Sequence, residues 1–398
     1  MPRAAIVSPL RTPIGGFLKS LAPLPAEELA AHIITSLVAK SGIDPDHIDD
    51  VVFAQSYANS EAPCIGRWAA LHAGLPISVP GCQVDRRCGG GLQAIITASM
   101  MVETGAADVV LAGGVESMSN VEFYSTAMRR GSKAGSTVLF DRLERGRERS
   151  QPAERFGVIS GMIETAENLA RDFCISREEA DEYSVESHRR AAAAWDAGKF
   201  NAEVVPVSIP GRKNEVQVLS RDEGIRHDCS IEALAGLRPI MAGGTVTPGN
   251  ASQQNDAAAA CLIVAEDKLS TLNLEPLAFL SGWAVTGCEP ATMGIGPVPA
   301  VSKLFQRAKL SWDDLDLIEL NEAFSAQVLA VMKGWGFADM SRINVNGSGI
   351  SLGHPIAATG VRIMTSMLYE LERRNGRRAL ETMCIGGGQG IAAVFERD

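Results

Sequence analysis

Residues 107–114 read Ala-Asp-Val-Val-Leu-Ala-Gly-Gly, and the apolar run from Val109 to Ala112 decides the fold class. A short strand that is apolar at every position is typical of a sheet covered on both faces by helices. Other short strands and Ala/Leu-rich helices are expected at 4–7, 26–40, 51–53 and 92–104. Strands that alternate with helices in this way predict an α/β fold.

A second copy of the pattern occurs near the C-terminus. Residues 379–386, Ala-Leu-Glu-Thr-Met-Cys-Ile-Gly, again run from an apolar strand into glycine. Upstream, residues 39–52 and 308–318 each combine a helix end, an acidic turn and a strand, about 267 positions apart. Two such pairs in the same order, at similar offsets, indicate a duplicated domain and not a solenoid.

Composition narrows the class of protein. The 398 residues are 46% hydrophobic and 21% charged, which is typical of a globular chain and excludes a mostly disordered one. A net charge of −10 argues against a general nucleic-acid binder. The longest apolar run, 257–265, is too short to cross a bilayer, and no apolar leader is visible, so we expect no membrane association.

The cysteines indicate a compartment. There are eight, and none form a C-x-x-C pair, so we expect neither a disulfide framework nor a metal site. Isolated thiols are typical of a reducing environment. We therefore expect a cytoplasmic protein.

Cys88 is the first candidate for chemistry. It lies in Arg86-Arg87-Cys88-Gly89-Gly90-Gly91, between an extended segment and the helix expected at 92–104. The positive end of a helix favours a thiolate, and the glycines let a substrate reach the sulfur and the backbone amides. An inert buried thiol is the alternative.

His354 is the partner that we expect for Cys88. It precedes Pro355 and stands 266 positions after Cys88, which is the offset of the repeat. In a pseudo-symmetric fold the two residues occupy equivalent turns that could face each other, and a histidine within reach of a cysteine can activate the thiol. A structural histidine is the alternative.

Two further motifs follow apolar strands. Cys384 enters the glycine loop 386–390, whose backbone N–H groups suit an oxyanion, and Asn321 follows the strand at 317–320. A phosphate-binding loop is the alternative for the glycine motif. However, the chain contains neither G-x-x-x-x-G-K-[ST] nor G-x-G-x-x-G, so no nucleotide-binding fingerprint supports it.

Together these motifs resemble those of the thiolase family, CoA-dependent enzymes that make or cleave 3-ketoacyl-CoA by Claisen chemistry. The resemblance covers nearly the whole chain. Besides the motifs above, it rests on residues 11–15, 88–94, 113–118, 165–168, 249–252 and 293–297.

The resemblance implies a role for each motif. Cys88 would carry the acyl group as a thioester, His354 would activate it, and Cys384 would exchange a proton with C2 of acetyl-CoA. Asn321 would hold a water in one oxyanion hole with His354, and the backbone amides of Cys88 and Gly386 would form the other. The remaining expected contacts are Arg226, Gly249 and Ser252 for CoA, and Met162 and Met293 for the acyl pocket.

The resemblance also implies a fold and partners. The thiolase fold has two pseudo-symmetric five-layered α-β-α-β-α halves, with a loop domain inserted in the first. We expect the N-terminal half at 1–120 and about 250–270, the inserted loop domain at 121–249, and the C-terminal half at 271–398. Coenzyme A would be substrate and product, without a metal or redox cofactor. The protein would act on acyl-CoA in fatty acid metabolism, as a homodimer or homotetramer.

A basic stretch lies inside the expected insertion. Residues 129–155 carry eight basic side chains against four acidic ones. A solvated surface is the simplest interpretation of such a charge run. The resemblance favours a second interpretation, in which this loop meets the phosphates of CoA.

Three positions depart from the family pattern. Asp85 stands where Asn is usual, and Gly90 stands where Ser is usual. Gly161 precedes Met162 where short-chain biosynthetic members carry His. Loss of an imidazole leaves space beside Met162, so we expect the acyl pocket to accept chains longer than acetoacetyl-CoA.

The sequence leaves three alternative functions. A ketoacyl synthase-like condensing enzyme would use two histidines, and Cys384 in its glycine loop argues against it. A non-catalytic CoA- or lipid-binding relative would not need Cys88, His354 and Cys384 together. A hydrolytic cysteine–histidine enzyme would show a burst of CoA and then water-dependent turnover.

Overall fold

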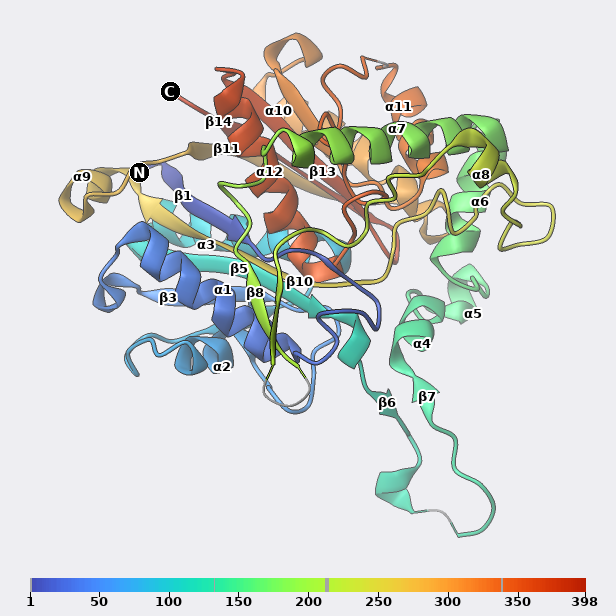
Figure 1. Ribbon diagram of the computed structural model, residues 1–398, viewed down its shortest axis with the longest axis horizontal. Helices are drawn as coiled ribbons and strands as arrows, with labels where there is room; N and C mark the ends of the chain where they lie inside the picture. The colour runs from blue at the N-terminus through green and yellow to red at the C-terminus, as the bar shows by residue number, and fades with distance from the viewer. Residues whose placement is uncertain (1, 132, 212–214, 338) are drawn as a thin grey trace.

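The computed structural model describes residues 2–131, 133–211, 215–337 and 339–398, and a mixed ten-stranded sheet forms its centre (Figure 1). The strands of this sheet are β1 (Ala4–Arg11), β2 (Gly15–Gly16), β3 (Asp50–Ala54), β4 (Cys82–Val84), β5 (Val109–Ser117), β10 (Asn255–Ala265), β11 (Ala278–Gly287), β12 (Leu317–Leu320), β13 (Arg378–Ile385) and β14 (Gln389–Glu396). Their order is β12-β13-β14-β11-β1-β10-β5-β3-β4, and β2 pairs with β10 beside this path.

The strand order confirms the duplication. In the first half β3 runs parallel to β5, which pairs antiparallel with β10, which pairs antiparallel with β1. In the second half β12 runs parallel to β13, which pairs antiparallel with β14, which pairs antiparallel with β11. The halves meet where β1 and β11 pair through Ala5 with Phe279 and Ile6 with Ala278. The two halves therefore repeat one plan across a central junction.

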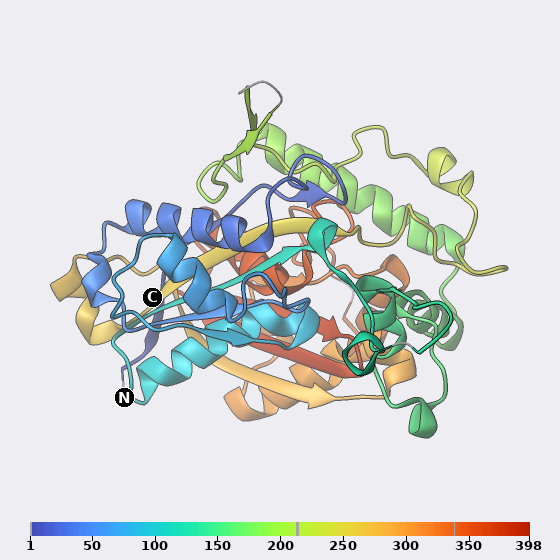
Figure 2. The ribbon, with the colours of Figure 1, turned by 90° about the horizontal axis from the view of Figure 1, so that it is seen from below.

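Helices separate and cover the two halves of the sheet. They are α1 (Ala26–Ser41), α2 (Ile65–His72), α3 (Gly90–Glu103), α9 (Leu269–Leu272), α10 (Pro297–Ala308), α11 (Ser325–Trp335) and α12 (Thr359–Arg373). Side chains of α1 and α2 form one core with the N-terminal strands, and those of α10 and α11 form another with the C-terminal strands. The third core joins α3 and α12 to both halves. The expected α-β-α-β-α layering is thus built by the two halves together (Figure 2).

Glycines let α3 and α12 approach closely in the central layer. A Cβ at Gly91 would lie 2.7 Å from the Ala357 carbonyl oxygen, and one at Gly360 would lie 2.2 Å from the Leu92 nitrogen. Both contacts are with backbone atoms, which cannot move aside without separating the helices. This contact brings the segments around Cys88 and His354 together.

The predicted elements around the repeat are confirmed, with one difference. The helices expected at 26–40 and 92–104 are α1 and α3, and the strand expected at 317–320 is β12. The strand at 109–112 continues through the glycine pair to Ser117. Side chains at Gly113 and Gly114 would lie 2.1 Å from the Phe53 ring and 2.1 Å from the Ala357 carbonyl oxygen. These glycines therefore permit close packing instead of ending the strand.

Between β5 and β10 the chain forms a region outside the main sheet. Its elements are β6 (Phe123–Tyr124), β7 (Phe140–Asp141), α4 (Arg142–Glu148), α5 (Ala153–Phe156), α6 (Met162–Asp172), α7 (Arg177–Asp196), β8 (Val207–Pro210), β9 (Val216–Leu219) and α8 (Ile231–Ala235). Strands β6 and β7 pair in an arm that projects from the body, and α7 lies along the C-terminal half (Figure 1). The limits of an inserted domain at 121 and 249 remain a prediction. Among the described residues, no helix has both the length and the apolar character to cross a membrane.

Candidate active site

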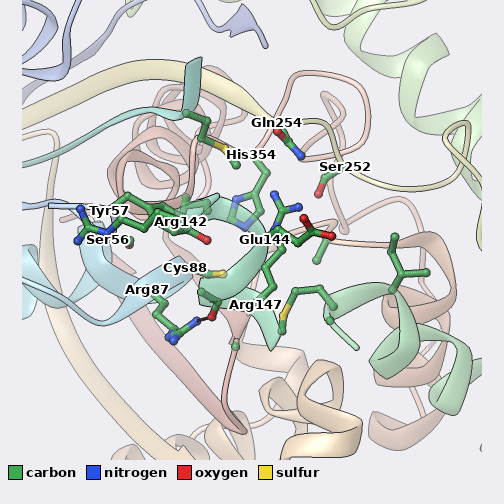
Figure 3. Close-up of a pocket in the computed structure, with 18 of the residues that line it drawn as sticks. Ser56, Tyr57, Arg87, Cys88, Arg142, Glu144, Arg147, Ser252, Gln254 and His354 are labelled. Carbon is green, nitrogen blue, oxygen red and sulfur yellow. Dashed lines mark hydrogen bonds between the residues drawn. The ribbon is translucent and has the colours of Figure 1, made fainter. Parts of the chain in front are cut away.

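A cavity of about 1170 Å³ lies where the inserted region meets both halves (Figure 3). The residues predicted from the sequence that line it are Cys88, Met162, Arg226, Ser252, Met293, His354, Cys384 and Gly386. Two predicted residues do not line it. Asn321 is fully buried, and Gly249 is buried beside the lining residue Pro248.

Cys88 lies in a single 3₁₀ turn, Arg87–Gly89, directly before α3. Arg87 has a φ of 46°, in the left-handed region, and its N–H donates to the Asp85 carboxylate at 2.7 Å. An arginine in this conformation is strained, and strain of this kind is concentrated at functional sites. The departure at Asp85 therefore has a local role, because its side chain stabilises the turn that presents Cys88.

The protonation state of Cys88 differs from the sequence-based expectation. Cys88 is partly exposed toward the cavity, yet burial of the sulfur raises the pKa of the thiol. Hydrogen bonding from the Gly386 N–H and the charge of Arg87 act in the opposite direction and do not outweigh it. The raised pKa favours the thiol over the thiolate that the helix N-terminus predicts, so a base is needed to form the nucleophile.

His354 can be that base. Its Nδ1 lies 2.7 Å from the hydroxyl of Thr359, the first residue of α12, and its backbone N–H donates to Asn255 Oδ1 at 2.9 Å. Burial lowers the pKa of His354 to about 3, with smaller contributions from the charges of Arg362 and Arg147. The imidazole is therefore neutral near pH 7. When Nδ1–H donates to the Thr359 hydroxyl, Nε2 is the nitrogen left to accept a proton, and Figure 3 shows the imidazole at the cavity with Cys88.

Cys384 is a second thiol in the same cavity. It is the next-to-last residue of β13, and the turn that follows contains Gly387 and Gly388 with φ of 91° and 85°. Burial raises the pKa of the Cys384 thiol well above its usual value, and the neighbouring thiols of Cys88 and Cys288 raise it further. The resting Cys384 is therefore protonated and can donate a proton to a carbanion.

Asn321 lies just after β12 with its backbone N–H bonded to the Thr382 carbonyl at 3.0 Å. Within the part of the chain described, neither atom of its buried side-chain amide has a hydrogen-bond partner. Buried amides are rarely left unpaired, so this group is suited to bind a small polar molecule. Its neighbour Glu322 accepts from the Tyr183 hydroxyl at 2.9 Å and from the Ile350 N–H at 3.1 Å, which ties this strand end to the His354 loop.

The cavity is also lined by residues to which the sequence assigned no individual site role, among them Ser56, Tyr57, Arg87, Arg142, Arg145, Arg147, Arg149 and Gln254. Four of the arginines come from the basic stretch, whereas Arg129 and Arg130 of that stretch are exposed near the projecting arm. The run of basic residues at 129–155 was the sequence signal for these arginines, but only some of its side chains line the cavity and the others are exposed to solvent. Across the residues that the structure describes, no group of acidic, histidine or cysteine side chains could hold a metal ion.

The position of Gly161 leaves open space. Gly161 has a φ of 149°, and a Cβ there would have one neighbour within 4 Å, the Arg147 Cβ at 3.8 Å. Ile163 lines the cavity, but Glu164 bonds to the N–H and hydroxyl of Ser160 at 2.7 Å. The Glu164 side chain therefore points to Ser160 and does not fill this space.

Comparison with known proteins gives one consistent result. The family model described as "Thiolase, N-terminal domain" matches residues 4–267, and "Thiolase, C-terminal domain" matches residues 274–397. An acetyl-CoA acetyltransferase of Chromobacterium violaceum is 44% identical over 99% of both chains, and the beta-ketothiolase BktB of Cupriavidus necator is 44% identical over 98% of both.

Solved structures agree with these relatives. The acetyl-CoA acetyltransferase of Bacillus anthracis has a TM-score of 0.95 and 39% identity, and covers 100% of this chain and 99% of its own. Human mitochondrial 3-ketoacyl-CoA thiolase in complex with CoA has a TM-score of 0.93 and 38% identity, over 100% of this chain and 98% of its own.

Proposed function

The chain belongs to the thiolase family and is a CoA-dependent acyltransferase, and we propose that it transfers the acyl group through a thioester on Cys88. The observation that carries this proposal is the set of resting protonation states. Cys88 and Cys384 have raised pKa values and His354 has a lowered one, so two thiols and a neutral imidazole share one cavity. This is the combination that cleavage of a 3-ketoacyl-CoA requires.

In the first half-reaction, His354 takes the proton of Cys88, and the thiolate attacks the 3-keto carbon of the substrate. The bond between C2 and C3 then breaks, and the acyl group stays on the sulfur. The electron pair left on C2 takes the proton of Cys384, which releases acetyl-CoA. The N–H groups of Gly386 and Cys88, which face the sulfur and lower its pKa, are suited to stabilise the oxyanion.

In the second half-reaction, the Cys384 thiolate takes the proton of an incoming CoA thiol. The CoA sulfur attacks the thioester on Cys88 and leaves as an acyl-CoA shortened by two carbons. The Cys88 thiolate then recovers its proton from His354. Because the acyl group waits on the enzyme between two substrates, ping-pong kinetics follow. We also assign to Asn321 a water in the second oxyanion hole, because its amide is buried and unpaired among the described residues.

We assign CoA binding to the side of the cavity that contains Arg226 and Ser252, with Gly249 behind them. Arg226 donates to the Pro248 carbonyl at 3.2 Å, which places its guanidinium beside this segment. We assign Met162 and Met293, which line the same cavity, to the acyl end. The presence of Cys384 with Cys88 and His354 favours this assignment over a ketoacyl synthase-like enzyme, a hydrolase or a non-catalytic binding protein.

We further propose a homodimer or homotetramer that works in fatty acid metabolism in the cytoplasm. Strand β4 stands at the end of the sheet order, and an unpaired edge can pair with a second copy. The arm around β6 and β7 exposes Phe123, Met128, Val138 and Leu139. The cytoplasmic assignment is supported by the relatives, which are bacterial acetyl-CoA acetyltransferase and beta-ketothiolase.

The function is tested with Cys384→Ser. Wild type should cleave acetoacetyl-CoA only when CoA is present, and should exchange the methyl protons of acetyl-CoA with deuterium. Cys384→Ser should still accept an acetyl group on Cys88 but should lose deuterium exchange by at least about a hundredfold, the usual scale for a positioned acid or base. Normal exchange in this variant would exclude Cys384 as the group that moves the C2 proton.

A further inference from the structure

The arginines that line the cavity form two groups. Arg226 belongs to one side, where its backbone N–H donates to His188 Nδ1 at 3.1 Å and its guanidinium contacts the Pro248 carbonyl. Arg147 belongs to the other side, where Figure 3 shows its side chain beside Cys88 and His354, whereas Arg87 extends away from both toward Gly146 and Ser150. The described lining includes six arginines and three carboxylates, although the protein as a whole carries a net charge of −10.

Arg147 lies at the reacting end of the cavity. Its charge lowers the pKa of His354, and it also opposes the rise in the pKa of Tyr57 that burial causes. The Tyr57 hydroxyl is influenced by Arg87 and Cys88 as well. Tyr57, Cys88, Arg147 and His354 all line the cavity, and Figure 3 shows them around one end of it.

Neither Arg87 nor Arg147 has an anionic partner in the described chain. Arg142 forms an ion pair with Glu122, whereas Arg87 and Arg147 form no ion pair within 4.0 Å among the described residues. Arg87 donates to the Gly146 carbonyl and the Ser150 hydroxyl, both at 3.1 Å. A guanidinium has five N–H donors, so Arg87 retains the capacity to bind an anion.

Arg147 retains the same capacity. With the oxygen of the Gln254 amide turned toward it, Arg147 donates to that oxygen from Nη2 at 3.1 Å and from Nη1 at 3.2 Å. Glu144 lies one turn earlier on α4, but it is exposed and forms no ion pair with Arg147 among the described contacts. The stem of Arg147 borders the open space at Gly161. There is therefore room for a ligand beside an unpaired, partly buried cation.

We propose that the preferred acyl group carries a carboxylate at its far end, so that the substrate is a 3-oxodicarboxylyl-CoA whose carboxylate pairs with Arg147. This inference rests on the proposed function and adds the substrate class. Planar pairing of a guanidinium with a carboxylate is strong and specific. The phosphates of CoA lie at the opposite end of the pantetheine arm from the reacting thioester. Arg147 lines the cavity beside His354 and borders the open space at Gly161, so it faces the acyl group and not the phosphates.

The experiment compares two substrates of equal length, 3-oxoadipyl-CoA with its terminal carboxylate and uncharged 3-oxohexanoyl-CoA. Wild type should show at least about a tenfold higher kcat/KM for 3-oxoadipyl-CoA, the scale of one charge-assisted contact. Arg147→Met should lower that value at least about tenfold while 3-oxohexanoyl-CoA changes by less than about threefold. Arg147→Lys, which keeps the charge without the planar fork, should lie between.

Arg149→Met is the matched control, because Arg149 is an exposed lining arginine of the same segment, and the substrate preference should persist in it. Equal kcat/KM values for both substrates in wild type would overturn the proposal, with no variant needed. A rise in KM for CoA in Arg147→Met, equal with both substrates, would overturn it too, because the arginine would then serve the phosphates. If wild type cleaved neither these substrates nor acetoacetyl-CoA, the proposed thiolase function would fail instead.

Discussion

Thr359→Val tests whether the orientation of His354 limits catalysis. Valine has nearly the shape of threonine, so the variant removes the 2.7 Å contact with Nδ1 and little else. Thr359 and His354 are both buried, so the ring nitrogen would lose its partner without gaining water. Leaving a buried polar group unpaired costs about 1–3 kcal/mol. If that cost falls on the transition state, kcat/KM drops by about 5- to 150-fold.

The assay is thiolysis of acetoacetyl-CoA, read together with the rate at which iodoacetamide alkylates Cys88. We expect kcat and the alkylation rate to fall together while KM for CoA stays within about twofold, because the CoA contacts are elsewhere. Thr359→Ser keeps the hydroxyl and should retain most of the activity. If kcat of Thr359→Val stays within twofold of wild type, or if Thr359→Ser is equally impaired, the Thr359 hydroxyl does not orient His354 for catalysis.

Three further outcomes are expected. Gly360→Ala places a Cβ 2.2 Å from the Leu92 nitrogen, so thermal melting should show a loss of about 1–3 kcal/mol or more; an unchanged Tm would contradict the close contact of α3 and α12. Because Gly161 leaves space in the cavity, kcat/KM for 3-oxohexanoyl-CoA should not fall more than about tenfold below that for acetoacetyl-CoA. Burial raises the pKa of Glu319 to about 8, so the folded state holds its proton more tightly than the unfolded state, and stability should fall as pH rises from about 4.5 to 8. Urea titrations should show a smaller fall for Glu319→Gln, and an equal fall would exclude Glu319 as the source.

The repeat and the elements that carry it could be predicted from the sequence because they depend on local pattern. The apolar run at Val109 and its counterpart before Cys384 both form strands, and the shared offset of Cys88 and His354 correctly placed them in one cavity. The glycines at 113–114 were harder to interpret. Glycine is required at these positions because Phe53 and Ala357, which are distant in sequence, pack directly against the strand.

The electrostatics of the site could not be predicted from local sequence. A helix N-terminus favours a thiolate, but burial raises the pKa of the Cys88 thiol, and burial depends on how segments distant in sequence pack around it. In the same way, the charge run at 129–155 does not distinguish Arg147, which lines the cavity, from the exposed Arg129. That distinction depends on how the inserted region packs against the sheet.

Mass mapping of the protein after brief incubation with acetyl-CoA shows whether Cys88 carries the acyl group. We expect one acetyl group, on the peptide that contains Cys88, which disappears when CoA is added and is absent from Cys88→Ala. Acetylation should persist in Cys384→Ser, because Cys384 acts on C2 and not on the thioester. An acetyl group on another residue, or steady turnover with Cys88 unmodified and replaceable by alanine, would contradict transfer through this thiol.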